Sequence, residues 1–120
     1  MSLDRFSAGS VVVGVAGLES PDIARRMADH APDVASFLKA LSHEGRLMIL
    51  CHLAGGEKSV TELEALLGQR QAAVSQQLAR LRLEGLVSTR RDGKAIFYAI
   101  HDPRVLELLR LLPAMITKAA

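Results

Sequence analysis

Apolar side chains recur at helical spacing in two consecutive segments in the middle of the chain, residues 60–67 and 71–84. The repeating positions are Leu63, Leu66 and Leu67 in the first segment and Val74, Leu78 and Leu81 in the second. Spacings of three and four residues place each set on one face of an α-helix. The pattern therefore predicts two short amphipathic helices joined by a tight turn at Gln69 and Arg70.

The residues at the ends of these two helices support the assignment. Ser59 followed three residues later by Glu62 is typical of a capping box, in which two side chains accept hydrogen bonds from backbone N–H groups at a helix start. Gly68 and Gly85 can adopt the left-handed conformation that often ends a helix. We therefore expect the first helix to begin at about Val60 and the second to end at about Glu84.

Beyond Gly85 the pattern changes from helical to strand spacing. Residues 86–91 and 95–100 are rich in β-branched and aromatic side chains, and Asp92-Gly93 between them is a strong signal for a hairpin turn. Two short helices followed by a hairpin make a winged helix-turn-helix. The predicted fold class is mainly α with a β-hairpin wing, which favours DNA binding.

Three further helices are expected ahead of this unit, over residues 20–30, 33–41 and 43–54. Ser20-Pro21 is a common helix start, and Ala31-Pro32-Asp33 is expected to break the first helix. Ser42 is expected to cap the third helix. The buried stripe expected on that third helix is Leu47, Leu50, Cys51 and Ala54.

The last predicted helix begins at Asp102-Pro103, where the carboxylate can cap it and the proline lacks an N–H that the first turn does not need. Its apolar positions are Val105, Leu106, Leu108, Leu109, Leu111 and Leu112. Because one small domain cannot cover so wide an apolar surface, we expect dimerisation through the N- and C-terminal helices. A monomer that buries this helix is the alternative. Residues 1–20 are expected to form a flexible extension, and residues 21–118 one DNA-binding and dimerisation domain.

Composition limits the compartment and the chemistry. The chain has 120 residues, of which 49% are hydrophobic, and this suits one core. The single cysteine, Cys51, rules out an intrachain disulfide and fits a reducing cytoplasm. The apolar run from Val11 to Leu18 is too short to span a bilayer, so no membrane partner is expected. The sequence has no Ser-His-Asp set, glycine-rich phosphate loop or metal cluster, so neither an enzyme nor a cofactor is expected.

Positive charge is concentrated on the predicted winged unit. The whole chain carries +2, but residues 70–94 contain six basic and two acidic residues, a net +4 against −2 for the rest. The bases are Arg70, Arg80, Arg82, Arg90, Arg91 and Lys94. This concentration is typical of proteins that contact phosphates, and a solvated charged surface is the alternative.

The outer face of the second helix has the chemistry to read DNA. Its side chains are Gln71, Ala72, Ser75, Gln76 and Ala79. Small side chains let a helix lie deep in the major groove, and a glutamine amide can pair with an adenine edge. The predicted contacts to double-stranded DNA are Gln71, Ala72, Ser75, Gln76, Arg80, Arg90, Arg91 and Lys94. A sequence-tolerant architectural DNA binder and a winged helix that binds only proteins are the alternatives.

Residues 37–104 resemble a known family. The runs FLKALSHEGRLMILCHL and SVTELEALLGQRQAAVSQQLARLRLEGLVSTRRDGKAIFYAIHDPR are similar to the ArsR/SmtB family of dimeric transcriptional repressors, and in detail to its biofilm growth-associated and sulfide-responsive branch. The resemblance implies a homodimer that binds a palindromic operator, an imperfect inverted repeat. It also implies that an effector releases the repressor from DNA.

The same resemblance allows the family's metal sites to be tested position by position. One class of sensors places paired cysteines where this chain has Ser59 and Thr61, neither of which is a thiolate. Another class uses an aspartate and three further ligands near the last helix. This chain matches the aspartate with Asp102 but has Arg104, Met115 and Lys118 at the other positions. No metal site is therefore expected.

Cys51 is the remaining effector candidate. In the sulfide-responsive branch, the matching cysteine pairs with a second one near the end of the last helix, where Thr117 is the nearest position in this chain. Pro113 is expected to kink or end the helix just before that point. Cys51 either senses a thiol-reactive signal alone, such as a persulfide or an oxidant, or only packs as a small hydrophobic residue.

Overall fold

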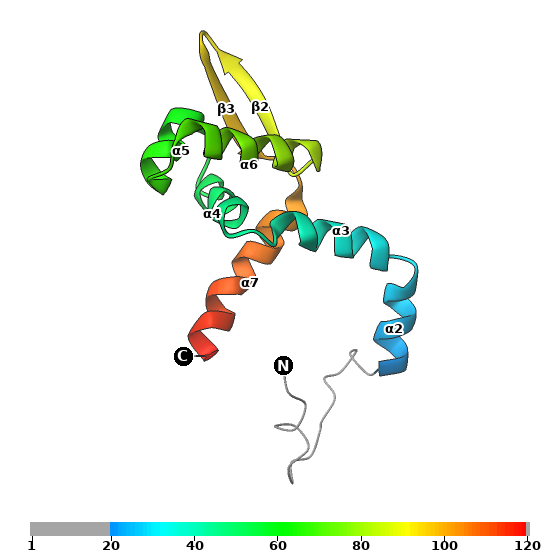
Figure 1. Cartoon of the computed structure of the whole chain (residues 1–120). Helices are drawn as coiled ribbons and strands as arrows, with labels where there is room; N and C mark the ends of the chain where they lie inside the picture. The colour runs from blue at the N-terminus through cyan, green and yellow to red at the C-terminus, as the bar shows by residue number, and fades with distance from the viewer. Residues whose placement is uncertain (1–19, 120) are drawn as a thin grey trace. The chain divides into compact units, whose positions relative to one another are not determined.

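The computed structural model describes residues 20–119, so the extension predicted over residues 1–20 lies outside the described residues apart from Ser20. In chain order the helices are α2 (Ser20–Ala28), α3 (Ala31–Leu41), α4 (Glu44–Leu53), α5 (Val60–Leu67), α6 (Gln71–Leu83) and α7 (Pro103–Ala119), and the strands are β1 (Lys58–Ser59), β2 (Val87–Asp92) and β3 (Ala95–Ile100) (Figure 1). The chain divides into two compact units, residues 1–35 and 36–120.

The described part of the first unit contains α2 and the first turn of α3. The break between them falls at Asp29 and His30, so Ala31-Pro32-Asp33 belongs to α3 and the predicted break at these residues is wrong. The backbone N–H of Val34 already bonds to the carbonyl oxygen of His30 at 2.9 Å. Proline is tolerated in a first turn because the N–H that it lacks has no partner there.

The second unit is built around one apolar core to which every one of its helices contributes. The buried side chains are Ala40 and Leu41 of α3, Ile49, Leu50 and Leu53 of α4, Leu63 of α5, Val74, Leu78 and Leu81 of α6, Leu86 and Val87 at the start of the wing, and Val105 of α7. The predicted inner stripe of α6 is therefore confirmed, since all three of its members are fully buried.

The capping box that starts α5 is confirmed. The backbone N–H of Glu62 donates to Ser59 Oγ (3.1 Å), and the backbone N–H of Ser59 donates to Glu62 Oε1 (2.9 Å). Gly68 ends α5 with φ 64°, a left-handed conformation that favours glycine. These local devices set the lengths of α5 and of the turn into α6.

The start of α4 differs from the prediction. His43 caps the helix, because its Nδ1 accepts a hydrogen bond from the backbone N–H of Gly45 (3.0 Å). Ser42 is not the cap, since its hydroxyl donates instead to the carbonyl oxygen of Lys39 (2.9 Å) at the end of α3. Only one residue separates the extended backbone of His43 from α3, and Ser42 is used to close the earlier helix.

The buried face of α4 was only partly predicted. Leu50 is buried as expected, but Cys51 and Ala54 are exposed, and Ile49 and Leu53 are buried in their place. Apolar residues surround most of α4, from Leu47 to Leu53, so periodicity alone does not identify the face that packs on the core.

The wing is a three-stranded antiparallel sheet with the order β1-β3-β2. Its hairpin turn contains Gly93 at φ 63°, as Asp92-Gly93 predicts. Arg90 lies opposite Phe97, and the two residues of β1, Lys58 and Ser59, lie opposite Tyr98 and Phe97. The third strand was not predicted because two residues are too few to show an alternating pattern.

The last helix begins where the sequence indicates. Asp102 Oδ1 accepts a hydrogen bond from the backbone N–H of Arg104 (2.9 Å), and the Arg104 side chain, which bonds the same carboxylate, is the main cause of a lowered Asp102 pKa. Pro113 does not end the helix, because α7 continues to Ala119 and Thr117 Oγ1 donates to the carbonyl oxygen of Pro113 (2.9 Å). The helix is thus long enough to present apolar residues beyond the core.

We expect Ser59→Ala and Glu62→Ala each to lower the free energy of unfolding by about 1 kcal/mol, because each change leaves a backbone N–H at the start of α5 without its partner. Urea denaturation at one fixed protein concentration measures this. Thr61→Ala, in the same first turn, is the matched control and should change stability by less than about 0.5 kcal/mol. An equal loss for the control variant would contradict a specific role for the box.

Candidate nucleic-acid interface

The outer stripe of α6 faces solvent, while its inner stripe is held in the core. Gln71, Ala72 and Gln76 are exposed and Ser75 is half-buried. All four therefore lie where the amphipathic pattern predicts, on a helix whose opposite face cannot move without opening the core.

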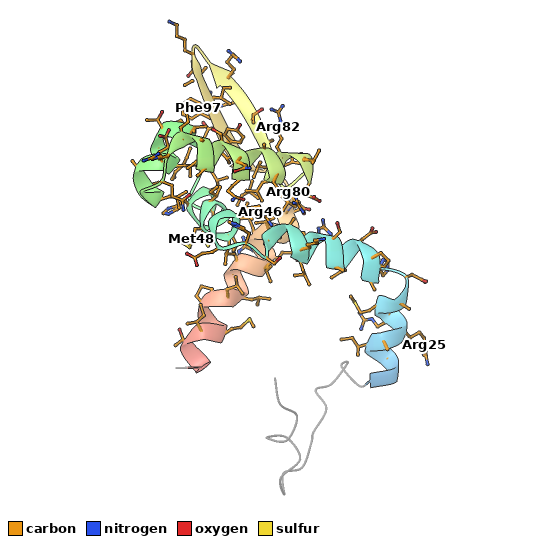
Figure 2. All side chains as sticks on the ribbon, viewed as in Figure 1. Arg25, Arg46, Met48, Arg80, Arg82 and Phe97 are labelled. Atoms are coloured by element: carbon orange, nitrogen blue, oxygen red, sulfur yellow. The ribbon has the colours of Figure 1, made fainter. Side chains whose placement is uncertain are left out.

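A polar contact that sequence reasoning missed fixes α6 laterally. Arg46 of α4, which is labelled in Figure 2, donates from Nε to the carbonyl oxygen of Ala40 (2.6 Å) and from Nη1 to Oε1 of Gln77 on α6 (3.3 Å). A guanidinium with several donors can join two elements in this way. Its position as the only arginine in a largely apolar helical segment was the available signal.

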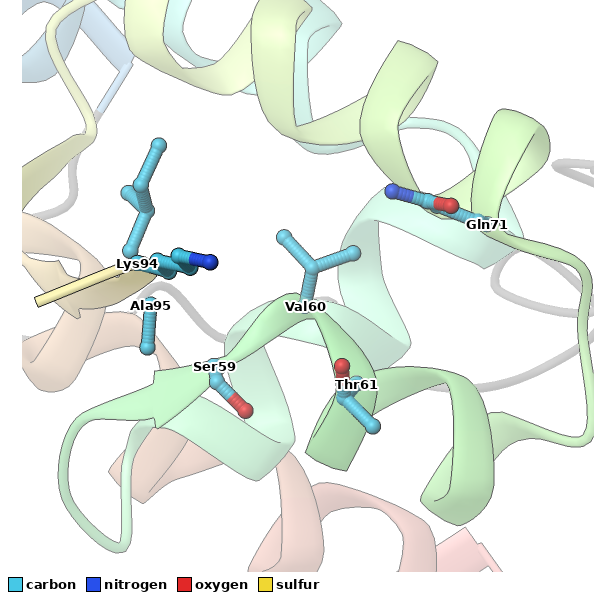
Figure 3. Close-up of a pocket in the computed structure, with 7 residues that line it drawn as sticks. Ser59, Val60, Thr61, Gln71, Lys94 and Ala95 are labelled. Carbon is cyan, nitrogen blue, oxygen red and sulfur yellow. The ribbon is translucent and has the colours of Figure 1, made fainter.

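A small pocket of about 230 Å³ joins the start of α6 to the wing. The described residues that line it are Ser59, Val60, Thr61, Gln71, Lys94, Ala95 and Ile96. Figure 3 shows Lys94 and Gln71 on opposite sides of Val60. The fold thus brings together two of the predicted DNA contacts that are 23 residues apart in the sequence.

The other predicted basic contacts differ in their surroundings. Arg80 forms an ion pair with Glu84 one turn later on α6 (3.1 Å), and Arg90 forms one with Glu57, which precedes β1. Within the described part of the chain, no ion pair involves Arg91 or Lys94, and both side chains are exposed. Sequence reasoning missed Glu57, because nothing in the linear pattern brings it next to the wing.

The arginine that pairs with Glu57 also meets an aromatic ring. The Arg90 guanidinium lies 4.7 Å from the ring centroid of Phe97 on the neighbouring strand. The side-chain hydrogen bond from Arg90 lowers the pKa of Glu57, and the same bond raises the pKa of Arg90. Both groups therefore remain charged throughout the neutral pH range.

The structure also places the candidate effector residues. Cys51 is exposed on α4 of the single chain, so it does not lie in the buried stripe predicted for that helix. Among residues 20–119, no group of three or more His, Cys, Asp or Glu side chains is arranged to hold a metal ion. Ser59 is engaged in the capping box and Asp102 in its bonds to Arg104. Between residues 20 and 119, none of the helices combines the length and the hydropathy that a membrane-spanning segment needs.

Comparison with known proteins agrees with this geometry. Residues 43–89 match the family described as bacterial regulatory protein, arsR family. A biofilm growth-associated repressor from Agrobacterium fabrum is 48% identical over 89 residues, which are 74% of this chain and 76% of that protein. The chain belongs to the ArsR family. It is accordingly a DNA-binding transcriptional regulator and not an enzyme.

Solved structures of ArsR-type proteins share the fold. The transcriptional repressor BigR from Xylella fastidiosa is 44% identical, with a TM-score of 0.73 over 76% of this chain and 93% of that one. The structure titled as a homodimeric winged helix-turn-helix DNA-binding domain, Mb0332 from Mycobacterium bovis, is 33% identical, with a TM-score of 0.66 over 78% of this chain and 86% of that one. The winged helix-turn-helix prediction is therefore confirmed.

Proposed function

We propose that this ArsR-family chain is a cytoplasmic homodimeric repressor that binds an inverted-repeat operator through two copies of α6. The observation that carries the proposal is the exposed polar stripe of α6, Gln71 to Gln76, beside the basic tip of the wing. The similar protein from Agrobacterium fabrum is named a repressor, and the similar domain from Mycobacterium bovis is described as homodimeric and DNA-binding.

A second subunit would cover apolar surface that this chain leaves open. On the far half of α7, Leu111, Met115 and Ile116 are 59%, 60% and 68% exposed. Leu38 of α3 and Met48 of α4 also remain exposed. Apolar patches of this kind usually mark an interface. A twofold axis between two copies of α7 would bury each patch against its copy.

The proposed dimer presents two α6 helices to successive major grooves on one face of the duplex, about 34 Å apart. Gln71, Ser75 and Gln76 read base edges, because amide and hydroxyl groups can both donate and accept. Lys94 and Arg91 neutralise phosphates from the wing. A dimer bound across a promoter then blocks transcription by occupying it.

A signal at Cys51 is the proposed route to release. The thiol is exposed on α4 next to the half-buried His52 and three residues from exposed Met48, so a small oxidant or polysulfide can reach it in the single chain. Modification there would release DNA only if the modified dimer favoured a spacing of the two α6 helices that fits the operator less well. An ArsR-type regulator without thiol sensing is the alternative.

Leu111→Glu is expected to convert the dimer into a monomer, since it would bury a carboxylate in the apolar α7 interface. Sedimentation velocity at a concentration where the wild type is dimeric measures the change. Leu83→Glu is the matched control, because Leu83 is also exposed, at 83%, but belongs to α6 and not to α7. If Leu111→Glu stays dimeric, α7 is not the interface.

Gln76→Ala should weaken binding to the cognate operator by about 1–3 kcal/mol while changing affinity for random duplex little, because its amide contacts a base. Fluorescence anisotropy on both duplexes measures this. Arg91→Gln is the comparison variant, expected to weaken both complexes alike. A wild type that binds the two duplexes equally would instead indicate an architectural DNA binder.

Cys51→Ser should keep near wild-type operator affinity under reducing conditions and should abolish release by polysulfide or peroxide. The serine hydroxyl preserves size but cannot form a persulfide or a sulfenic acid. Operator release is followed with and without oxidant, and mass spectrometry of the wild type identifies the adduct. Release that persists in Cys51→Ser would eliminate Cys51 as the sensor.

A further inference from the structure

We propose that Glu57 and Arg90 form a strap that positions the wing, and that Arg90 is not one of the wing's DNA contacts. This inference rests on the proposed DNA-binding function and refines it. It withdraws Arg90 from the contacts expected from sequence and leaves Arg91 and Lys94 as the basic groups of the wing that meet phosphates.

The strap runs across the middle strand of the sheet. Glu57 immediately precedes β1, Arg90 lies on β2, and β3 separates these two strands. Arg90 Nε donates to both carboxylate oxygens of Glu57, at 3.0 and 2.8 Å, and Nη2 donates to Oε1. The same guanidinium group of Arg90 also lies over the ring of Phe97 on β3, the strand between β1 and β2. The Arg90 side chain therefore links β2 and β3 to the residue that immediately precedes β1.

The donors of Arg90 are already directed at carboxylates. Besides the bonds from Nε and Nη2 to Glu57, Nη1 lies 3.8 Å from Asp92 Oδ2. A phosphate would have to displace Glu57 and would approach two negative charges. Because a phosphate contact gains affinity by releasing condensed cations, a base that is already neutralised by the protein contributes little to that term.

Strand alternation separates Arg90 from Arg91. Successive side chains of β2 point to opposite faces, so Arg91 shares a face with half-buried Thr89 and buried Val87. That face of β2 packs on the core, because Val87 belongs to the same buried cluster as the inner stripe of α6. Arg90 lies on the opposite face with exposed Ser88. The strap thus occupies the back of the wing, while Arg91 lies on the side of the reading helix.

The energy of the strap is modest and its effect is geometric. The side chains of Arg90 and Glu57 are 52% and 38% exposed, so solvent screens their attraction. Their bidentate bonds and the contact with Phe97 nevertheless fix one orientation of the two outer strands. Wing angle matters because Arg91 and Lys94 must reach phosphates while α6 occupies its groove.

The first test is the salt dependence of operator binding. Arg91→Gln should reduce the slope of log affinity against log salt by about 1.8 per dimer, one phosphate per subunit. Arg90→Gln should lower affinity at most severalfold and leave the slope unchanged. Arg90→Glu should weaken binding more strongly, and the charge swap Glu57→Arg with Arg90→Glu should recover most of that loss, because it rebuilds the ion pair at the same net charge.

A slope that falls as much in Arg90→Gln as in Arg91→Gln, with no rescue by the swap, would show that Arg90 contacts DNA and would overturn the inference. A wild type with no salt-dependent affinity for any duplex would instead overturn the proposed function.

The second test needs no DNA. Amide hydrogen exchange over residues 87–100 of the free protein should become faster in Glu57→Gln and Arg90→Gln, and the double variant should be no faster than either single one. Arg91→Gln is the control and should leave the exchange unchanged. Unaltered exchange in both strap variants would remove the positioning role, whatever the DNA measurements show.

Discussion

The burial of one face of α6 is the constraint on which the rest of this protein depends. Val74, Leu78 and Leu81 are fully buried, and each contributes about 1.5–3 kcal/mol relative to an exposed side chain. They pack with Leu63 of α5 and with Ile49 and Leu50 of α4 in a single cluster. Since a helix has one orientation in which this stripe is covered, the same packing determines that Gln71, Ala72 and Gln76 face outward. The proposed reading surface is thus a consequence of the core, and the hydrogen bond from Arg46 to Gln77 only helps to fix where along that core α6 lies.

Structural features that depend on only a few neighbouring residues could be predicted from the sequence. The capping box of Ser59 and Glu62, the left-handed Gly68 and the Asp92-Gly93 hairpin all depend on backbone geometry within one turn, and the structure has each of them. The same holds for the buried apolar stripe of α6, because polar residues lie on both sides of it. Prediction failed where the local pattern was ambiguous. Apolar residues on most sides of α4 hid which face is buried, and a proline suitable for a first turn was taken as a break.

The candidate site shows a second limit, which concerns charge. Counting residues 70–94 gives +4, but Glu57 lies outside that window and is bonded to Arg90 within it. Arg80 is also paired, with Glu84, but that acid lies inside the window and is already subtracted in the count. A charge count along the sequence therefore overstates the number of bases available to a phosphate, because pairing is decided by strand order and register. The short strand β1, which no sequence pattern announced, is what carries Glu57 to the wing.

In the proposed complex few groups on each chain read bases, and this links the function of α6 to that of α7. If Gln71 and Gln76 each discriminate by about 1–3 kcal/mol, one subunit supplies about 2–6 kcal/mol, whereas specific regulators exceed their own non-specific binding by about 4–10 kcal/mol. A second copy of α6 doubles the contribution of one subunit to about 4–12 kcal/mol, which spans the range that specific regulators reach. The uncovered residues Leu111, Met115 and Ile116 are then not a separate feature of the chain. In the proposed dimer they are the means by which a helix with so short a polar stripe would reach the specificity that an operator requires.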